Sequence, residues 1–238
     1  MKKLLYTILF LLTISSGLAK GQAALLVLIF GEKVASENFY FSLKAGLNYS
    51  MITGVEDGNN RVGFNFGLVN NIRLNDKLFL TPEFLALSTK GVSDVPVQTT
   101  GDEDLDDLLL DVESTDRKLN YLDIPVLLKY SITERLSISA GPEFSFLLDA
   151  TDVYYSSQID NIVLNAKLDI KEHLNFFDLA GVIDLSYMVA KPVHGKGINI
   201  YLRYSRGFLD IPKDNPGDPY KNSTLQIGAS FPFIEVTE

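Results

Sequence analysis

The sequence contains no cysteine, no tryptophan and only two histidines among its 238 residues. Without cysteine, the fold has neither disulfide bonds nor thiolate ligands or nucleophiles. His173 is expected in a loop and His194 in a short turn, whereas a histidine-based hydrolase or metal site needs partners held close by. No serine stands in a Gly-x-Ser-x-Gly elbow. We therefore predict a protein that is not an enzyme, with no catalytic residue and no cofactor.

The sequence also lacks any apolar run of about 20 residues, the length that a membrane-spanning helix needs. The apolar run over 4–14 is shorter, it follows two lysines, and the small residues Gly17 and Ala19 come after it. This pattern is typical of a secretory signal peptide rather than of a membrane anchor. We predict a signal peptide over 1–21, with cleavage between Ala19 and Gln22, and therefore export from the cytoplasm.

A second apolar run, Ala23 to Phe30, would open the mature chain and is too short to span a membrane as a helix. Residues 22–38 are therefore assigned to an N-terminal apolar segment and link, whose role the sequence leaves open. The alternating strands described next occupy 39–233, and 234–238 form a C-terminal tail.

Apolar and polar residues alternate over 121–130 and again over 136–148, with a short polar turn between. Alternation on both sides of a tight turn predicts a β-hairpin. Globular strands mostly stop near about five or six residues, whereas a tilted strand needs about 9–11 residues to cross a bilayer. The two segments of this hairpin have the length of membrane-crossing strands. The same alternation recurs over 39–50, 62–73, 78–88, 177–189, 198–207 and 224–233.

The connections between these eight segments alternate strictly between short and long. The short ones are 74–77, 131–134 and about 190–197, and the long ones are 51–61, 89–117, 149–176 and 208–221. Outer-membrane barrels show this asymmetry, with short periplasmic turns and longer external loops. We predict an all-β fold, a closed up-and-down antiparallel transmembrane barrel of eight strands. A further alternating piece over 162–170 leaves a count of ten open.

The polar face of the strands decides which side is the interior. It is rich in glycine and serine and carries equal numbers of basic and acidic residues, as expected of a narrow lumen in which each buried charge needs a partner. On the apolar face, aromatic residues gather near strand ends, as in the girdles of membrane barrels. A soluble barrel with an apolar interior fits less well. The predicted lumen charge network is Lys44, Arg73, Glu83, Asp123, Lys129, Arg135, Glu143, Asp178, Asp184 and Arg203.

The predicted loop over 101–116 holds eight of the thirty acidic residues. Asp102, Asp104, Asp106 and Glu113 match positions 1, 3, 5 and 12 of an EF-hand calcium loop. The glycine that such a loop needs at position 6 is replaced by Asp107, so this is a weak metal candidate and a solvated external loop is favoured. The acidity also argues against binding to nucleic acid, which requires basic patches.

Three stretches resemble the Bacteroidetes-type outer-membrane β-barrel family often labelled PorT-like. They are FSLKAGLN over 41–48, YLDIPVLLKY over 121–130 and AGPEF over 140–144. The resemblance extends over 39–233 and implies an architecture and a bacterial outer-membrane location. It implies no shared catalytic or ligand-binding residues.

The expected function is that of a non-enzymatic outer-membrane barrel with a self-filled polar lumen, whose external loops act in envelope structure, adhesion or partner docking. Its partners would be outer-membrane lipid and, through the loops, other envelope or secretion proteins. Three alternatives stay open. They are an accessory component of a protein secretion system, which the resemblance suggests, a narrow solute channel, and a soluble ligand-binding barrel.

Overall fold

The computed structural model describes residues 35–36, 38–55, 58–95, 112–156, 165–191, 197–213 and 219–233. The predicted signal peptide, Ala23–Phe30, His194 and the C-terminal tail lie outside the described residues. The elements are β1 (Ala35–Ser36), β2 (Phe39–Thr53), β3 (Asn59–Arg73), β4 (Leu78–Val95), β5 (Val112–Ser131), β6 (Leu136–Ser156), β7 (Asn165–Asp169), the short 3-10 helix η2 (Lys171–His173), β8 (Phe177–Ala190), β9 (Ile198–Gly207) and β10 (Lys221–Phe233).

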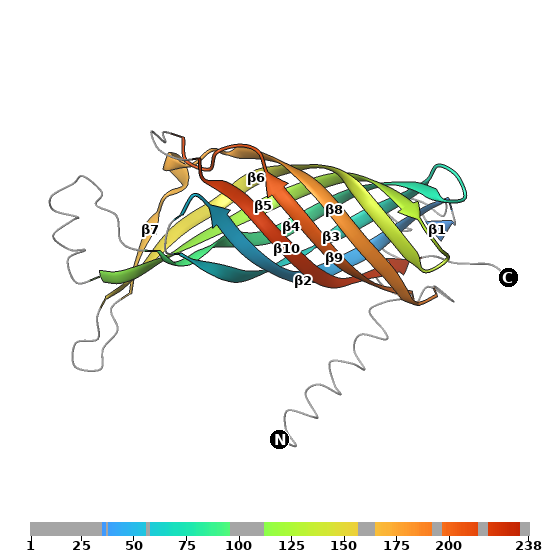
Figure 1. The fold of residues 1–238 in the computed structure, drawn as a ribbon, viewed down its shortest axis with the longest axis horizontal. Coiled ribbons are helices and arrows are strands. Elements are labelled where there is room, and N and C mark those ends of the chain that lie inside the picture. The colour runs from blue at the N-terminus through green and yellow to red at the C-terminus, as the bar shows by residue number, and fades with distance from the viewer. Residues whose placement is uncertain are drawn as a thin grey trace, which may run out of the picture.

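Eight of these strands form one closed antiparallel ring, and the predicted fold class is confirmed. The ring runs β2-β10-β9-β8-β6-β5-β4-β3 and closes because β2 also pairs with β3 (Figure 1). Two short strands lie outside the ring: β1 pairs with the start of β2, and β7 pairs with the far part of β6. The additional strand suspected near 162–170 therefore extends the wall at β6 and adds no strand to the barrel.

The two ends of the barrel differ. At the turn end, β3 joins β4, β5 joins β6 and β8 joins β9, and the first two of these connections, 74–77 and 132–135, are short turns. At the loop end, β2 joins β3, β4 joins β5, β6 joins β8 and β9 joins β10, and β7 and η2 lie there (Figure 1). Among the described residues, no helix is long and apolar enough to span a membrane.

Strands β4, β5 and β6 run further at the loop end than the sequence pattern indicated. The segment 89–117 was expected to be a loop, but β4 continues to Val95 and β5 already begins at Val112. The pairs Thr89↔Asn120 and Val92↔Arg117 hold these extensions together, because an uninterrupted backbone ladder needs no apolar alternation. We call residues 89–95, 112–120 and 149–156, together with β7, the raised wall.

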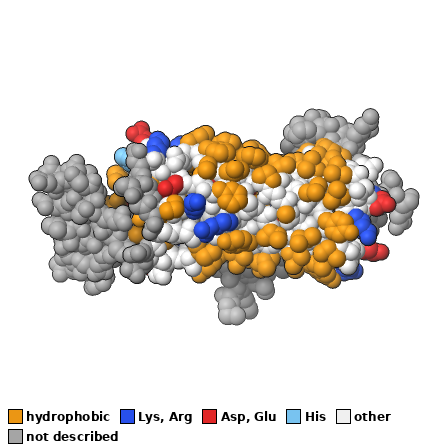
Figure 2. Space-filling model, turned by 45° about the horizontal axis from the view of Figure 1, so that its top comes forward, with side chains coloured by type: hydrophobic (Ala, Val, Ile, Leu, Met, Phe, Trp, Pro, Cys, Tyr) orange, Lys and Arg blue, Asp and Glu red, His pale blue; other side chains and the backbone are white. Residues whose placement is uncertain are grey.

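The outward face of the barrel is apolar. Figure 2 shows hydrophobic side chains covering much of the visible wall between the two ends. Exposed large side chains on neighbouring strands meet in register, for example Leu47, Ile227 and Leu202. A soluble protein rarely exposes so wide an apolar surface, whereas lipid requires it. The predicted orientation, with apolar residues outward and polar residues inward, is confirmed for the middle of the barrel.

This orientation predicts the effect of a charge on the wall. Ile227 lies midway along β10 and is 61% exposed, so Ile227→Lys would place an ammonium group near the bilayer midplane. We expect it to lower the free energy of unfolding in lipid vesicles by about 2–4 kcal/mol, measured by urea titration. Ile132→Lys is the matched control, because Ile132 is 47% exposed but lies in a turn. Equal, small effects of both changes would contradict a lipid-facing wall.

Candidate functional site: the lumen and its cap

Four fully buried charged residues form the first ion network, in the half of the lumen nearer the turn end. The Arg203 guanidinium donates from Nη1 to Oε2 and from Nη2 to Oε1 of Glu83, at 2.8 and 2.6 Å. Its Nε donates to Asp184 Oδ2 at 2.9 Å. The Lys44 ammonium lies 3.2 Å from Glu83 Oε1 and 3.6 Å from Asp184 Oδ2. Two cations thus face two carboxylates, so this network is neutral.

Tyr201 covers one side of this network. The Lys44 ammonium lies 4.0 Å from the centre of the Tyr201 ring, within the range of a cation–π contact. The Tyr201 hydroxyl donates to Asn65 Oδ1 at 2.9 Å. Gly46 and Gly228 leave the space for this hydroxyl, because a Cβ atom at either position would lie within 2.8 Å of it. The glycines of the polar face thus make room for large buried side chains.

The second ion network lies nearer the loop end and centres on Lys90. Its ammonium lies 3.0 Å from Asp123 Oδ2 and 3.3 Å from Glu143 Oε1, and it also donates to Ser145 Oγ at 3.4 Å. All these side chains are buried. One ammonium faces two carboxylates, so the group carries a net negative charge when both are ionised.

Sequence reasoning missed Lys90 because a β-bulge reverses the alternation in β4. Leu85 pairs with Asp123, but Ser88 pairs with Tyr121, so β4 uses three residues where β5 uses two. Before the bulge Thr81 and Glu83 point inward, and after it Ser88 and Lys90 do. The sequence does contain a signal, because Leu85 and Leu87 interrupt the polar side of the segment 78–88, and a change of phase at that point would place Ser88 and Lys90 on the polar face.

The other predicted lumen residues have different partners. Lys129 donates to Asn71 Oδ1 at 3.3 Å, and Asp178 accepts from Asn222 Nδ2 at 2.9 Å. Arg73 ends β3 at the rim and pairs with the turn residue Asp76 at 2.9 Å. Arg135 is exposed in the turn before β6. The prediction that Arg73 and Arg135 belong to a buried network is therefore corrected, since both lie at the turn end, where water reaches them.

Towards the loop end, the lumen is filled by apolar side chains, which the sequence analysis did not expect. Ile52, Val92, Leu119, Tyr121 and Leu147 point inward from the strands and are buried. Three residues that come from connections, Ile170, Leu174 and Ile211, complete this cluster. The interior is thus mainly polar between the turn end and this apolar plug, and a few buried polar groups such as Asn222 and Asp152 also lie towards the loop end.

The plug is held by a cap, which we define as residues 170–176 and 208–213. Its two segments are hydrogen-bonded to each other: Asn175 N–H donates to Ile211 O at 2.8 Å, and the Asn175 side chain donates to Asp210 O and Pro212 O. The cap is also tied to β6, because Ile170 N–H donates to Ala150 O. His173, in η2, accepts the Lys213 N–H with its carbonyl oxygen.

Charged pairs continue along the raised wall. Arg117 donates to both carboxylate oxygens of Asp152, at 2.9 and 2.7 Å, and Arg61 lies 3.3 Å from Asp116. Asp116 also accepts from the Tyr155 hydroxyl. Partial burial and the neighbouring Asp116 carboxylate raise the pKa of Tyr155 above its ordinary value, so this tyrosine remains a donor.

A small cavity lies inside the barrel. It has a volume of about 40 Å³ and is lined by residues of the first ion network, among them Lys44, Glu83 and Asp184. Within the described part of the chain, no group of three or more His, Asp or Glu side chains could hold a metal ion. Asp102, Asp104, Asp106 and the Glu113 side chain lie outside that part.

A family model described as an outer membrane protein beta-barrel domain matches residues 32–212. The chain belongs to this family. It is therefore an outer-membrane β-barrel protein, and the narrower PorT-like assignment stays a prediction. A search of curated proteins finds no match.

Solved outer-membrane proteins are similar to this chain at low sequence identity. The attachment invasion locus protein Ail of Yersinia pestis, solved with the heparin analogue sucrose octasulfate, is 17% identical with a TM-score of 0.43, covering 82% of this chain and 99% of Ail. A major outer membrane protein of Thermus thermophilus is 14% identical with a TM-score of 0.46, covering 82% and 99%. OprG of Pseudomonas aeruginosa is 12% identical with a TM-score of 0.39, covering 84% and 99%.

The first ion network predicts a strong effect of losing its arginine. Among the described residues, Arg203→Met would leave Lys44 as the one remaining ion-pair partner within 4.0 Å of the Glu83 and Asp184 carboxylates. We expect a loss of about 3–5 kcal/mol in the free energy of unfolding, because a buried charge then lacks its partner. Lys191→Met is the control, since Lys191 and Glu134 form an exposed pair worth about 0–1 kcal/mol. Urea titration would measure both, and equal losses would refute the buried network.

Proposed function

We propose that this protein is a non-enzymatic, non-conducting outer-membrane barrel that displays its loop end outside the cell for envelope structure, adhesion or partner docking. Residues 1–21 act as the signal peptide that allows export, and 39–233 form the barrel. The observation that carries this proposal is the filled lumen. Because the interior offers no room for a solute, the surface at the loop end is the part left to interact.

Three successive barriers support the non-conducting role. From the turn end, a solute would meet the first ion network around Arg203, then the second around Lys90, then the apolar plug beneath the cap. Each cation is held by at least two carboxylate contacts or hydrogen bonds, so opening a path would separate buried ion pairs. An eight-stranded barrel is only wide enough for side chains to fill it.

The raised wall supports the display role. β5 and β6 contain 20 and 21 residues, about twice the 9–11 residues that a tilted strand needs to cross the bilayer. β9 contains 10 residues, so the extension lies on one side of the barrel (Figure 1). The excess extends the hydrogen-bonded wall beyond the membrane as far as Val95 of β4 and Val112 of β5, and the acidic residues of 101–111 come between these two strand ends in the sequence.

The filled lumen predicts electrical silence. Protein purified with detergent and inserted into a planar bilayer is expected to give no stepwise conductance, while a general porin in the same bilayer supplies the positive control. Insertion is verified by recovery of the folded band from the bilayer lipid. Reproducible current steps would contradict the proposal and favour the alternative of a narrow channel.

The display role predicts that an external loop can be removed without loss of the folded barrel. In a deletion strain complemented with a variant whose residues 96–111 are replaced by a short Gly/Ser linker, we expect a normally inserted barrel but loss of surface adhesion or of cross-linking to envelope partners. The strain complemented with the full chain is the control. Unchanged adhesion and cross-linking would contradict this role. A block in export of cargo proteins in the deletion strain, restored by both chains, would instead favour the secretion alternative.

A further inference from the structure

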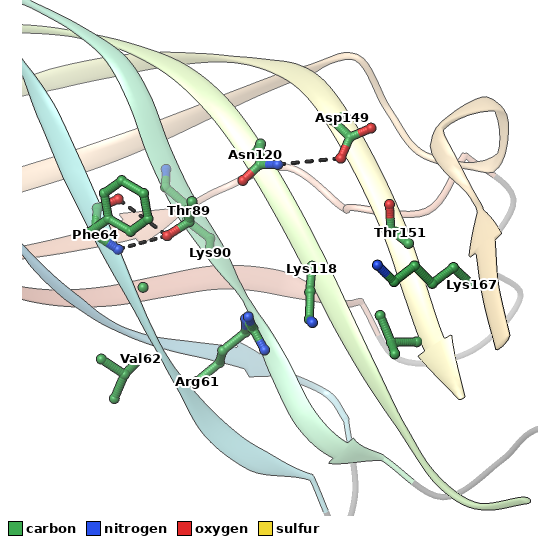
Figure 3. Close-up of a pocket in the computed structure, with 12 residues that line it drawn as sticks. Arg61, Val62, Phe64, Thr89, Lys90, Lys118, Asn120, Asp149, Thr151 and Lys167 are labelled. Carbon is green, nitrogen blue, oxygen red and sulfur yellow. Dashed lines mark hydrogen bonds between the residues drawn. The ribbon is translucent and has the colours of Figure 1, made fainter. Parts of the chain in front are cut away.

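A basic hollow lies on the outer surface of the raised wall, outside the lumen. It has a volume of about 270 Å³. Its charged lining from the outer face consists of Arg61, Lys118 and Lys167 against Asp149 (Figure 3). Figure 3 shows Lys167 reaching from β7 towards β5, so that its ammonium lies near the space that Lys118 and Arg61 also border. The hollow therefore carries an excess of positive charge.

The two lysines are the unneutralised part of this lining. Arg61 is paired with Asp116, and Asp149 accepts from Asn120. Among the residues that the structure describes, neither Lys118 nor Lys167 forms an ion pair with an acidic side chain, although the wall around them is rich in such pairs. Both ammonium groups border the hollow, so an anion bound in it would be attracted by two unpaired positive charges.

The level of the hollow along the barrel indicates what that anion is attached to. A tilted strand crosses the bilayer in about 11 residues. Counting 11 residues from the turn end of each strand leads to Gly63 in β3, Ser88 in β4 and Tyr121 in β5. The hollow is lined by Val62, Thr89 and Asn120, which are the next residues along each strand. It therefore lies at the edge of the hydrocarbon region on the loop side, where lipid head groups begin.

The surface below the hollow is apolar. Val62 and Phe64 line it and are 63% and 49% exposed, and Phe66 continues the exposed row towards the turn end. A ligand with an anionic head and acyl chains would place its head against Lys118 and Lys167 and its chains against this row. Figure 2 shows basic side chains next to the hydrophobic surface near the loop end, as this arrangement requires.

We propose that the hollow binds the phosphate group of a phosphorylated glycolipid in the outer leaflet, with Lys118 and Lys167 as the phosphate ligands and Thr151 as a hydroxyl donor. Thr151 is part of the lining, and Figure 3 shows it beside Lys167. Bound lipid would fix the height and tilt of the barrel and anchor β7, through Lys167, to the membrane surface. This site depends only on the barrel being embedded in a membrane and is independent of the adhesive role.

The test uses the full chain folded in detergent micelles and native mass spectrometry with diphosphorylated lipid A as the probe. The variant carries Lys118→Gln and Lys167→Gln, and the matched control carries Lys77→Gln and Lys191→Gln, two exposed lysines near the turn end, so both variants lose the same charge. We expect the first pair to weaken lipid A binding roughly 10–30-fold, at about a factor of five per lysine near a membrane surface, and the second to leave it unchanged. Heat-shifted gel mobility verifies folding.

Two further measurements separate the sources of the anion. We expect dephosphorylated lipid A to bind the wild-type protein weakly, with the same affinity that lipid A has for the Lys118/Lys167 variant. We expect inorganic phosphate at equal concentration not to compete with lipid A for the wild-type protein. Replacement of both lysines by arginine should preserve binding. Equal binding by all variants, equal binding of dephosphorylated lipid, or full competition by inorganic phosphate would each overturn the assignment.

Discussion

The fold depends on one constraint: within the hydrocarbon of a membrane every backbone N–H and C=O must find a partner in the protein. The register from Phe39↔Ile72 to Ser50↔Arg61 between β2 and β3 meets this constraint by removing the last free sheet edge. Closure with eight strands then sets the diameter of the interior. The packing of the interior follows from this diameter. Inward polar side chains have no room for bulk water, so they must find their hydrogen-bond and ion-pair partners among one another.

The interior meets this demand with dense, mutually paired polar groups and with a change to apolar packing near the loop end. The single guanidinium of Arg203 donates to two carboxylates. Tyr201 reaches its position because Gly46 and Gly228 carry no side chain. Buried ion pairs are weak sources of stability but costly to disrupt singly. They therefore fix the packing and exclude a pore, which leaves the loop end and the outer wall as the surfaces available for interaction.

The alternation of apolar and polar residues was sufficient to predict eight strands, their order and their orientation, because side-chain period and burial coincide on a two-sided sheet. It located both ends of β9, the turn ends of β3, β4 and β6, and the loop end of β8. The pattern failed where that coincidence breaks down. The bulge at Leu85–Leu87 moved Lys90 to the interior, and strands beyond the membrane no longer need an apolar face.

The cap and plug could not be predicted for a different reason. Ile170, Leu174 and Ile211 come from two connections that are separated in the sequence, and only the hydrogen bonds between the two segments bring them together over the lumen. The hollow at Lys118 and Lys167 likewise joins residues of β5 and β7 that are far apart in the sequence. Such sites depend on contacts between residues that are distant in the sequence, and the local alternation of apolar and polar residues does not predict these contacts.

Because the natural chain contains no cysteine, single cysteines along β10 can carry a spin label without background. The most direct test of the central claim is the accessibility of labels at Leu225, Gln226, Ile227 and Ser230 to lipid-soluble oxygen in vesicles. The structure predicts high oxygen accessibility at 225 and 227 and low accessibility at 226 and 230. The reverse alternation, or no alternation at all, would contradict a wall with apolar residues towards lipid and polar residues towards a closed interior.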